Sequence, residues 1–446
     1  MRIILKNFRL VDEETDMPGG VVIEDGIISS VQAPTAKEEN AALVIDGSRL
    51  SAKGHPVKEL PVLMPAFVDL HAHFRDPGFP DKENLESASL AAAAGGFGTV
   101  VCMANTKPVI DTLEKAAAIK SRSDALGIVD LYPVISLTKG MEGKELSGIS
   151  ALPKKNESGL FIPLMLSEDG KDVANDDLFL AAMKEAKRVG ISISCHCDFG
   201  GDEAEAAKNA GQPRSVWSRI EENNATCRAI ELGKKAGCHI HIAHVSTKEA
   251  VQAIRQAKAE LRHSGGGFTL TCEVMPHNFC LTEETAGKLG AESWGRVNPP
   301  LRREDDRKAL IHAVMDGTID AIATDHAPHS NADKEAGAAG FSAFETAFAA
   351  AFTELVAGCV IDLKRLSFLM SASPAKLIGL DTGAEGRGRI LPGMRADLVI
   401  VDTENFWSVH PETFKTRGKN SPFIGMTLSG KILMTIRGGR IVFVSQ

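Results

Sequence analysis

From about residue 61 the sequence alternates short apolar runs, rich in β-branched residues, with helix-like segments. The strand candidates are residues 62–70, 98–104, 128–136, 159–166, 190–196, 238–244, 268–275 and 319–324. The clearest helix candidates between them are residues 84–94, 112–126, 175–189, 215–236, 247–262 and 304–316. Eight strands that alternate with helices over this length predict an α/β fold, a (β/α)8 TIM barrel. A doubly wound open sheet is the alternative, but no glycine-rich dinucleotide fingerprint follows the first strand.

The two ends of the chain have a different pattern. Residues 20–28 and 396–402 have the short apolar runs of β-hairpins, and Gly438 and Gly439 mark a turn between the last two runs. We therefore predict a small β-sandwich domain that is formed from both termini, residues 1–60 together with 380–446. The catalytic barrel would then occupy residues 61–379.

Composition limits the possible partners. The chain has 446 residues, of which 43% are hydrophobic, and a formal net charge of −8, which argues against a nucleic-acid partner. The longest apolar run, residues 90–104, is interrupted by glycines and is too short to span a membrane. The eight cysteines are scattered without a C-x-x-C pair, and the N-terminus lacks the apolar core of a signal peptide. We expect a cytoplasmic protein that does not contact membranes.

The first predicted strand carries two histidines, His71 and His73, directly after Asp69. Residues two apart on a strand point to the same side, so one metal ion could bind both imidazoles. Arg75 follows with the same spacing and would point the same way if the extended run continues. A metal beside a fixed guanidinium suggests a small anionic substrate.

Other strand ends supply further candidate ligands, since chemistry in a barrel sits at the carboxyl ends of its strands. The fifth strand ends in His196, the sixth in His244 and the eighth in Asp325, while the fourth runs into Glu168 and Asp169. One such residue alone would more often be structural, but their coincidence at one end of the barrel favours a metal site. Four imidazoles with two or three carboxylates exceed the needs of one tetrahedral zinc. They predict two metals, with an acid from the fourth strand as the bridge and Asp325 as a proton carrier.

At this point the sequence resembles the amidohydrolase superfamily and, within it, the bacterial dihydroorotases whose metal site has a carboxylate bridge. The likeness covers nearly the whole chain. It is carried by residues 71–78, 103–108, 169–170, 244–248, 298–302 and 324–329. The resemblance implies the reversible interconversion of N-carbamoyl-L-aspartate and L-dihydroorotate in pyrimidine biosynthesis.

The resemblance also implies a role for each candidate residue. Two Zn2+ ions per chain would be held by imidazoles and carboxylates: His71 and His73 on one ion, His196 and His244 on the other, Asp169 between them, and Asp325 near the first. The substrate would be bound by Arg75, Asn105, Asn298, His329, Ala339 and Gly340. Hydroxide would attack the ring amide carbonyl, and Asp325 would pass the proton to the leaving nitrogen.

Some positions depart from the family pattern and leave alternatives open. No lysine occurs in residues 159–169, which favours a carboxylate bridge over a carboxylated lysine, although Glu168 competes with Asp169 for that role. Ala104 stands where proline is usual, and residues 337–341 lack the bulkier pattern of the family. The alternatives are a hydantoinase, dihydropyrimidinase or allantoinase, and a non-catalytic dihydroorotase-like scaffold. A homo-oligomer, or association with another pyrimidine-pathway enzyme, is the expected assembly.

Overall fold

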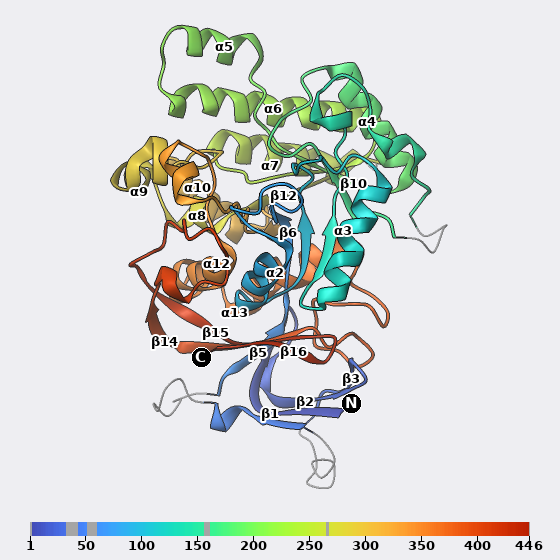
Figure 1. The fold of residues 1–446 in the computed structure, drawn as a ribbon, viewed down its shortest axis with the longest axis vertical. Coiled ribbons are helices and arrows are strands. Elements are labelled where there is room, and N and C mark those ends of the chain that lie inside the picture. The colour runs from blue at the N-terminus through green and yellow to red at the C-terminus, as the bar shows by residue number, and fades with distance from the viewer. Residues whose placement is uncertain (1, 33–42, 51–59, 156–160, 265–266, 446) are drawn as a thin grey trace.

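The structure is a computed structural model that describes residues 2–32, 43–50, 60–155, 161–264 and 267–445. Figure 1 shows a helix-rich part of the molecule placed on a sheet near which both chain ends lie. Within the described residues, no helix has the length and apolar character needed to cross a membrane.

Eight parallel strands form the barrel, as the sequence predicts. One sheet holds β6 (Phe67–Ala72), β7 (Phe97–Cys102) and β8 (Asp130–Pro133). A second sheet holds β9 (Met165–Ser167), β10 (Ser192–Cys195), β11 (His239–Ile242), β12 (Thr269–Val274) and β13 (Ala321–Ile322), in that spatial order. Isolated parallel bridges, Ile135 with Leu166 and Ala72 with His326, connect the ends of the two sheets. The carboxyl ends of all eight strands therefore meet on one face.

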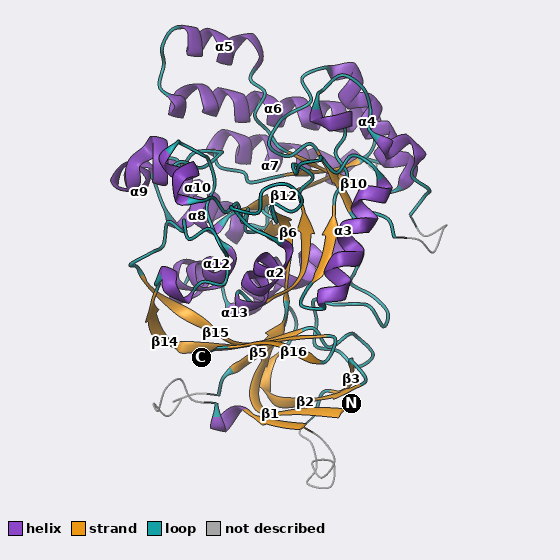
Figure 2. Ribbon diagram, viewed as in Figure 1, coloured by secondary structure: helices purple, strands orange, loops and turns teal. Residues whose placement is uncertain are grey.

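Helices lie between consecutive strands and cover the outside of the barrel (Figure 2). Those that the sequence predicts are α2 (Leu85–Ala94), α3 (Leu113–Leu126), α4 (Asp176–Val189), α6 (Arg214–Ala236), α7 (Lys248–Ser264) and α10 (Glu304–Met315). The predicted starts at Asn84, Thr112 and Asn175 are N-caps, whose side chains accept a hydrogen bond from the amide three residues on. Shorter helices are α5 (Gly201–Asn209), α8 (Pro276–Cys280), α9 (Glu283–Leu289), α11 (Asn331–Glu335), α12 (Phe344–Ala351), α13 (Leu363–Ser367) and α14 (Ser373–Leu377).

Two strand predictions need correction. The predicted strand 62–70 is two strands, because the backbone changes sheet after Pro65, and its first part is β5 (Val62–Pro65). Ala66 donates its amide to Asp397 and Phe67 donates to Gly96, so neighbouring residues bond to different parts of the protein. The predicted strand 159–166 contains only the start of the three-residue β9, and residues 159–160 lie outside the described residues.

Strands from both ends of the chain form one mixed sheet of eight strands. Its members besides β5 are β1 (Arg2–Val11), β2 (Asp16–Glu24), β3 (Ile27–Ser30), β4 (Leu43–Asp46), β14 (Leu398–Ser408), β15 (Thr427–Arg437) and β16 (Arg440–Val444). The order is β16-β15-β14-β5-β1-β2-β3, with β4 paired to β1. β5 thus joins the N-terminal strands to the C-terminal strands. The division into domains at residues 60 and 380 stays a prediction.

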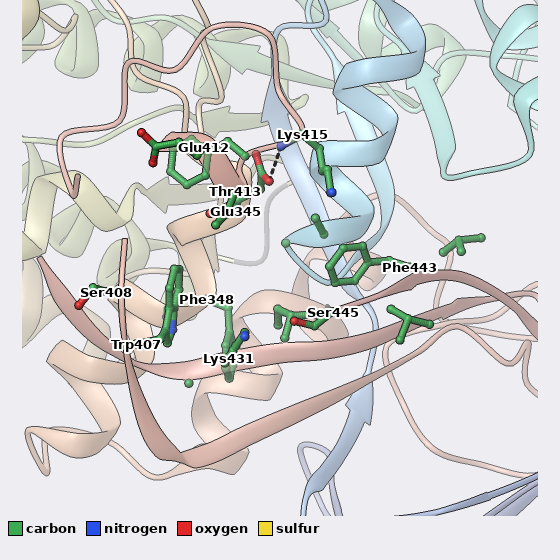
Figure 3. A pocket seen from close by; sticks show the side chains of 18 residues that line it. Glu345, Phe348, Trp407, Ser408, Glu412, Thr413, Lys415, Lys431, Phe443 and Ser445 are labelled. Atoms are coloured by element: carbon green, nitrogen blue, oxygen red, sulfur yellow. Dashed lines mark hydrogen bonds between the residues drawn. The ribbon is translucent and has the colours of Figure 1, made fainter. Parts of the chain in front are cut away.

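A cavity of about 540 Å³ lies where this sheet meets the barrel helices (Figure 3). Phe348 of α12, Trp407 of β14 and Phe443 of β16 line it. The carboxylate of Glu345 in the same cavity accepts a 2.7 Å hydrogen bond from the amide of Lys415. The lining residues include no histidine and no cysteine, so the imidazole candidates lie elsewhere.

Candidate metal centre

The candidate metal ligands gather at the carboxyl ends of five barrel strands. His71 lies in β6 and His73 follows it, while His196 comes directly after β10. The remaining three follow their strands by two or three residues: Asp169 after β9, His244 after β11 and Asp325 after β13. All six are buried.

Asp169 stands at the middle of the cluster. Its carboxylate oxygens face four imidazole nitrogens: His71 Nε2 at 3.2 Å, His73 Nε2 at 3.3 Å, His196 Nδ1 at 3.1 Å and His244 Nε2 at 3.8 Å. Burial raises the pKa of Asp169, but the charges of the imidazoles lower it further, so the pKa lies well below its ordinary value. One ionised carboxylate therefore touches histidines from three separate strands.

Glu168, the neighbouring acid, faces away from this cluster. Its Oε2 accepts hydrogen bonds from the amides of Leu137 at 2.8 Å and Thr138 at 3.0 Å. The side chain of Thr138 donates to Oε1. Glu168 therefore holds the loop after β8, and of the two adjacent acids only Asp169 is placed between the histidines.

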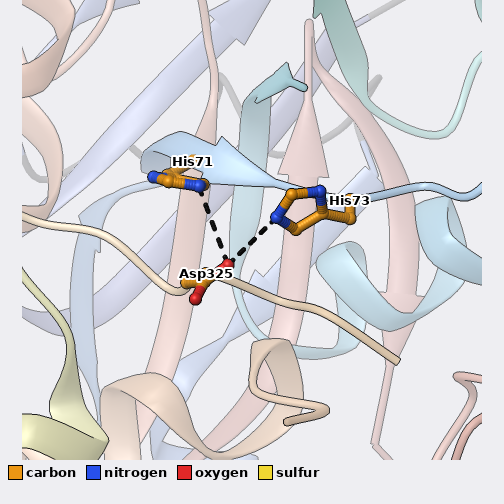
Figure 4. Close-up of side chains that lie close together, drawn as sticks. All are labelled: His71, His73 and Asp325. Atoms are coloured by element: carbon orange, nitrogen blue, oxygen red, sulfur yellow. Dashed lines mark hydrogen bonds and ion pairs between the residues drawn. The ribbon is translucent and has the colours of Figure 1, made fainter. Parts of the chain in front are cut away.

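Asp325 contacts the first pair of histidines (Figure 4). Its Oδ1 lies 3.1 Å from His73 Nε2 and 3.7 Å from His71 Nε2. Burial raises the pKa of Asp325, but the hydrogen bond with His73 and the charges of both histidines hold it below its ordinary value. Asp325 and His244 have φ angles of 45° and 33°, a region that non-glycine residues rarely occupy. Such strain is typical of residues that a site holds in a required position.

The second nitrogen of three imidazoles is engaged by an outer partner. His71 Nδ1 lies 2.8 Å from Glu273 Oε1, and His73 Nδ1 lies 2.9 Å from Asn105 Oδ1. Both partners are oxygen acceptors, so each Nδ1 can donate its proton to them, and each Nε2 would then offer its lone pair to a metal ion bound in the cluster. His196 Nε2 lies 3.0 Å from Asp198 Oδ2.

Glu273 and Asp198 were not predicted from the sequence. Glu273 is fully buried in β12, and the signal that could have revealed it is a carboxylate inside an otherwise apolar strand. An acid in that place needs partners, and they are His71 on one carboxylate oxygen and His241, 3.1 Å from the other. Asp198 follows His196 by two residues, a spacing that by itself carries no specific signal.

The cluster fits a divalent metal. His71 Nε2 is buried and has no hydrogen-bond partner among the described residues, although it points at the oxygens of Asp169 and Asp325. Lone pairs on imidazole nitrogen and carboxylate oxygen repel unless a proton or a metal ion lies between them. Two groups bring three possible ligand atoms within 4.8 Å of one another: His71 with His73 and Asp325, and His71 with Asp169 and His244. Imidazole and carboxylate donors suit zinc.

Five of the six substrate candidates line a cavity of about 230 Å³ beside this cluster. Its lining residues include both metal-ligand and substrate candidates: His73, Arg75, Asn105, Asp169, His196, His244, Asn298, Asp325, Ala339 and Gly340, together with Gly170 and Ala327. His71 lies beneath them, fully buried. The structure thus brings together residues that are more than 250 positions apart in the chain.

His329 lies beside this cavity and is not one of its lining residues. Burial lowers the pKa of His329 to about 3, so the imidazole is neutral at neutral pH. Its Nε2 donates to the carbonyl of Ala339 over 2.9 Å and lies 3.3 Å from Nη2 of Arg75. His329 therefore contacts two residues that line the cavity, Arg75 and Ala339, without lining the cavity itself.

Comparisons with known proteins identify the family of this chain. The sequence matches the amidohydrolase family over residues 62–442. A dihydroorotase of Clostridium botulinum is 37% identical over 443 residues, which cover 99% of this chain and 100% of the relative. A dihydroorotase of a Thermoanaerobacter species is 36% identical, with 99% and 97% covered.

Solved structures of related enzymes have the same fold. An L-hydantoinase (dihydropyrimidinase) from Arthrobacter aurescens has a TM-score of 0.81 at 25% identity, covering 100% of this chain and 97% of the other. A dihydropyrimidinase from Brevibacillus agri has a TM-score of 0.81 at 21% identity, with 99% and 95% covered. The fold is that of the TIM-barrel amidohydrolases, and the sequence relatives narrow the group. The chain belongs to the amidohydrolase family and, within it, to the dihydroorotases.

Proposed function

We propose that this protein is a zinc-dependent enzyme that interconverts N-carbamoyl-L-aspartate and L-dihydroorotate. The observation that carries the proposal is that the guanidinium of Arg75 lines the same 230 Å³ cavity as the imidazole cluster. A cation beside a metal site suits a cyclic amide that carries a carboxylate, which hydantoin and dihydrouracil lack. The full-length likeness to dihydroorotases supports the same substrate.

The candidate ligands would form two neighbouring metal sites. His71 and His73, with Asp325 beside them, would hold one ion, and His196 and His244 would hold the other, with Asp169 between the two. His71 would hold an ion through Nε2 only, because its Nδ1 is engaged by Glu273. Zinc bound there would polarise a carbonyl oxygen and lower the pKa of water towards about 7.

The protein's own side chains would bind the substrate and move its proton. Arg75 and Asn105 would hold the carboxylate, helped by His329 and Asn298, and Ala339 and Gly340 would form the wall beside the ring. In hydrolysis a C–O bond forms at the ring carbonyl and the C–N bond breaks. Asp325 would take the proton from the attacking water and give it to the leaving nitrogen. The reverse transfers close the ring.

The direct test is turnover of dihydroorotate and metal analysis on one purified sample. A charge-assisted contact contributes about 1.5–3 kcal/mol, so kcat/KM for dihydroorotate should exceed that for hydantoin or dihydrouracil by about 10- to 150-fold. Faster hydrolysis of a neutral ring, allantoin included, would contradict the substrate assignment. A protein that loads zinc and turns over none of these compounds would instead be a scaffold.

Glu273→Gln should weaken metal binding without disturbing the fold. The amide keeps an oxygen acceptor for His71 Nδ1 but loses the charge that makes this imidazole a better ligand. Outer partners of metal-bound histidines typically contribute about 10- to 100-fold in metal affinity. Chelator competition against zinc would measure the change. Glu345→Gln, which removes a carboxylate in the cavity of Figure 3, is the control, and equal zinc affinity for the two variants would refute the role of Glu273.

Assembly and location are further proposals. We infer a cytoplasmic enzyme that forms a homo-oligomer or associates with another enzyme of the pyrimidine pathway. Size-exclusion chromatography with light scattering would establish the oligomeric state directly.

A further inference from the structure

We propose that Lys334 is a positioning residue that fixes the wall of the substrate cavity and adapts it to an anion. Lys334 lies in the short helix α11, nine residues after Asp325, and its side chain is fully buried. Its Nζ donates three hydrogen bonds to backbone carbonyls: Arg296 at 2.8 Å, Ala338 at 2.9 Å and Gly340 at 3.0 Å. An ammonium group has three N–H donors, so all are used.

The environment of this ammonium group is unusual for a lysine. The ring of Phe341 lies 5.3 Å from Nζ, and no carboxylate among the described residues forms an ion pair with it. Burial lowers the pKa of Lys334 to about 8, which keeps the group mostly protonated at neutral pH. Burying an unpaired charge is costly, and lysines are rarely found this way. A residue retained at that cost is expected to have a specific task.

The three carbonyls identify the task, since they belong to two segments of the cavity wall. Ala339 and Gly340 line the cavity, and Arg296 lies two residues before Asn298, which also lines it. The amide of Gly340 donates to the same carbonyl of Arg296 over 3.1 Å. Lys334 therefore sets the spacing between the Asn298 segment and the 338–340 loop.

This loop requires glycine at position 340. Its φ is 139°, and a Cβ atom there would lie 2.7 Å from the carbonyl oxygen of Ala327. The loop thus approaches the backbone of Ala327 closely, and Gly340 has no side chain with which to fix this approach.

The hydrogen bonds also change the electrostatic potential at this part of the cavity wall. The carbonyls of residues 338, 339 and 340 all accept from side chains: Lys334 binds the first and the third, His329 the second, and Asn420 donates to Gly340 over 2.9 Å. Free carbonyl oxygens repel a carboxylate, and engaged ones do so less. The buried ammonium adds positive charge behind them. The wall is therefore suited to the anionic substrate of the proposed function, on which this inference rests.

Lys334→Met tests the inference, because it keeps the volume of the chain and removes charge and donors. We expect KM for dihydroorotate to rise about 10- to 100-fold, the scale of a displaced contact, while kcat and zinc content stay within about threefold. Amide hydrogen exchange of residues 338–341 should accelerate. Lys155→Met is the matched control: its Nζ also donates to a carbonyl, of Ile378 at 2.9 Å, but it lines a different cavity, with His239. This control should leave KM unchanged.

The outcomes separate the two proposals. If the unaltered protein does not hydrolyse dihydroorotate, the proposed function fails, and hydrogen exchange still decides whether Lys334 holds the loop. Unchanged KM and unchanged exchange in Lys334→Met overturn the inference, as does a loss confined to kcat or zinc. If Lys334→Met does not fold, Lys334→Gln, which retains two donors, is measured instead. If neither folds, Lys334 serves the fold itself and the inference is rejected.

Discussion

Asp325→Asn should abolish most turnover while leaving zinc bound. General acid–base catalysis typically contributes about 100- to 10,000-fold, and kcat should fall by that factor. The carboxylate of Asp325 lines the cavity and lies 3.1 Å from His73 Nε2, at the boundary between the imidazole cluster and the substrate space. An amide keeps the oxygen that contacts His73 but accepts no proton at neutral pH. The chemical step is therefore lost while the contacts that shape the site remain.

Two measurements and one control variant make this result specific. Zinc content, measured in excess metal, and the binding of carbamoyl aspartate should match those of the unaltered protein. Asp320→Asn is the control on the same strand segment: Asp320 pairs with Lys258 and accepts from the amide of Cys272 over 2.8 Å at the opposite end of β13. It should lower the melting temperature but not kcat. A kcat within tenfold of normal in Asp325→Asn would exclude Asp325 as the proton carrier.

The sequence predicts the barrel and most of this cluster for the same reason. Strand periodicity places the ends of the parallel strands on one face, so His71, His196 and His244 can be assigned to one site from their positions in the chain. The N-cap residues likewise mark the helix starts, because their side chains satisfy the first free amides. These signals are local, and the structure confirms the elements that they predict.

Features that depend on contacts between distant parts of the chain cannot be predicted from local sequence patterns. The predicted strand 62–70 divides at Pro65 because β5 pairs with β14, which belongs to a different sheet from β6. These partners lie more than 330 residues apart in the chain, so no local sequence pattern predicts their pairing. Glu273 and Lys334 are buried charges whose partners are brought by other strands and loops. The choice between Glu168 and Asp169 has the same origin, since adjacent residues point to opposite sides and only the loop at Leu137 shows which acid is already engaged.

Asp169→Asn should therefore remove metal from the centre. Asp169 is the carboxylate that faces four imidazole nitrogens, at distances from 3.1 to 3.8 Å. Removing one partner from a buried charged cluster typically costs about 3–5 kcal/mol, which corresponds to a loss of zinc affinity on the order of 1,000-fold. That exceeds the effect expected for Glu273, which contacts only one of the candidate metal ligands, His71. Turnover at limiting zinc should fall with the metal content.

Glu168→Gln is the matched control for this result, because it changes the adjacent acid of the same loop. Its carboxylate binds the amides of Leu137 and Thr138, so the loss of charge should lower the melting temperature while zinc content stays normal. Chelator competition and metal analysis on both variants compare them directly. Loss of zinc in Glu168→Gln with retention in Asp169→Asn would reverse the assignment. Loss in Asp169→Asn alone would identify Asp169 as the acid that the proposed metal centre requires.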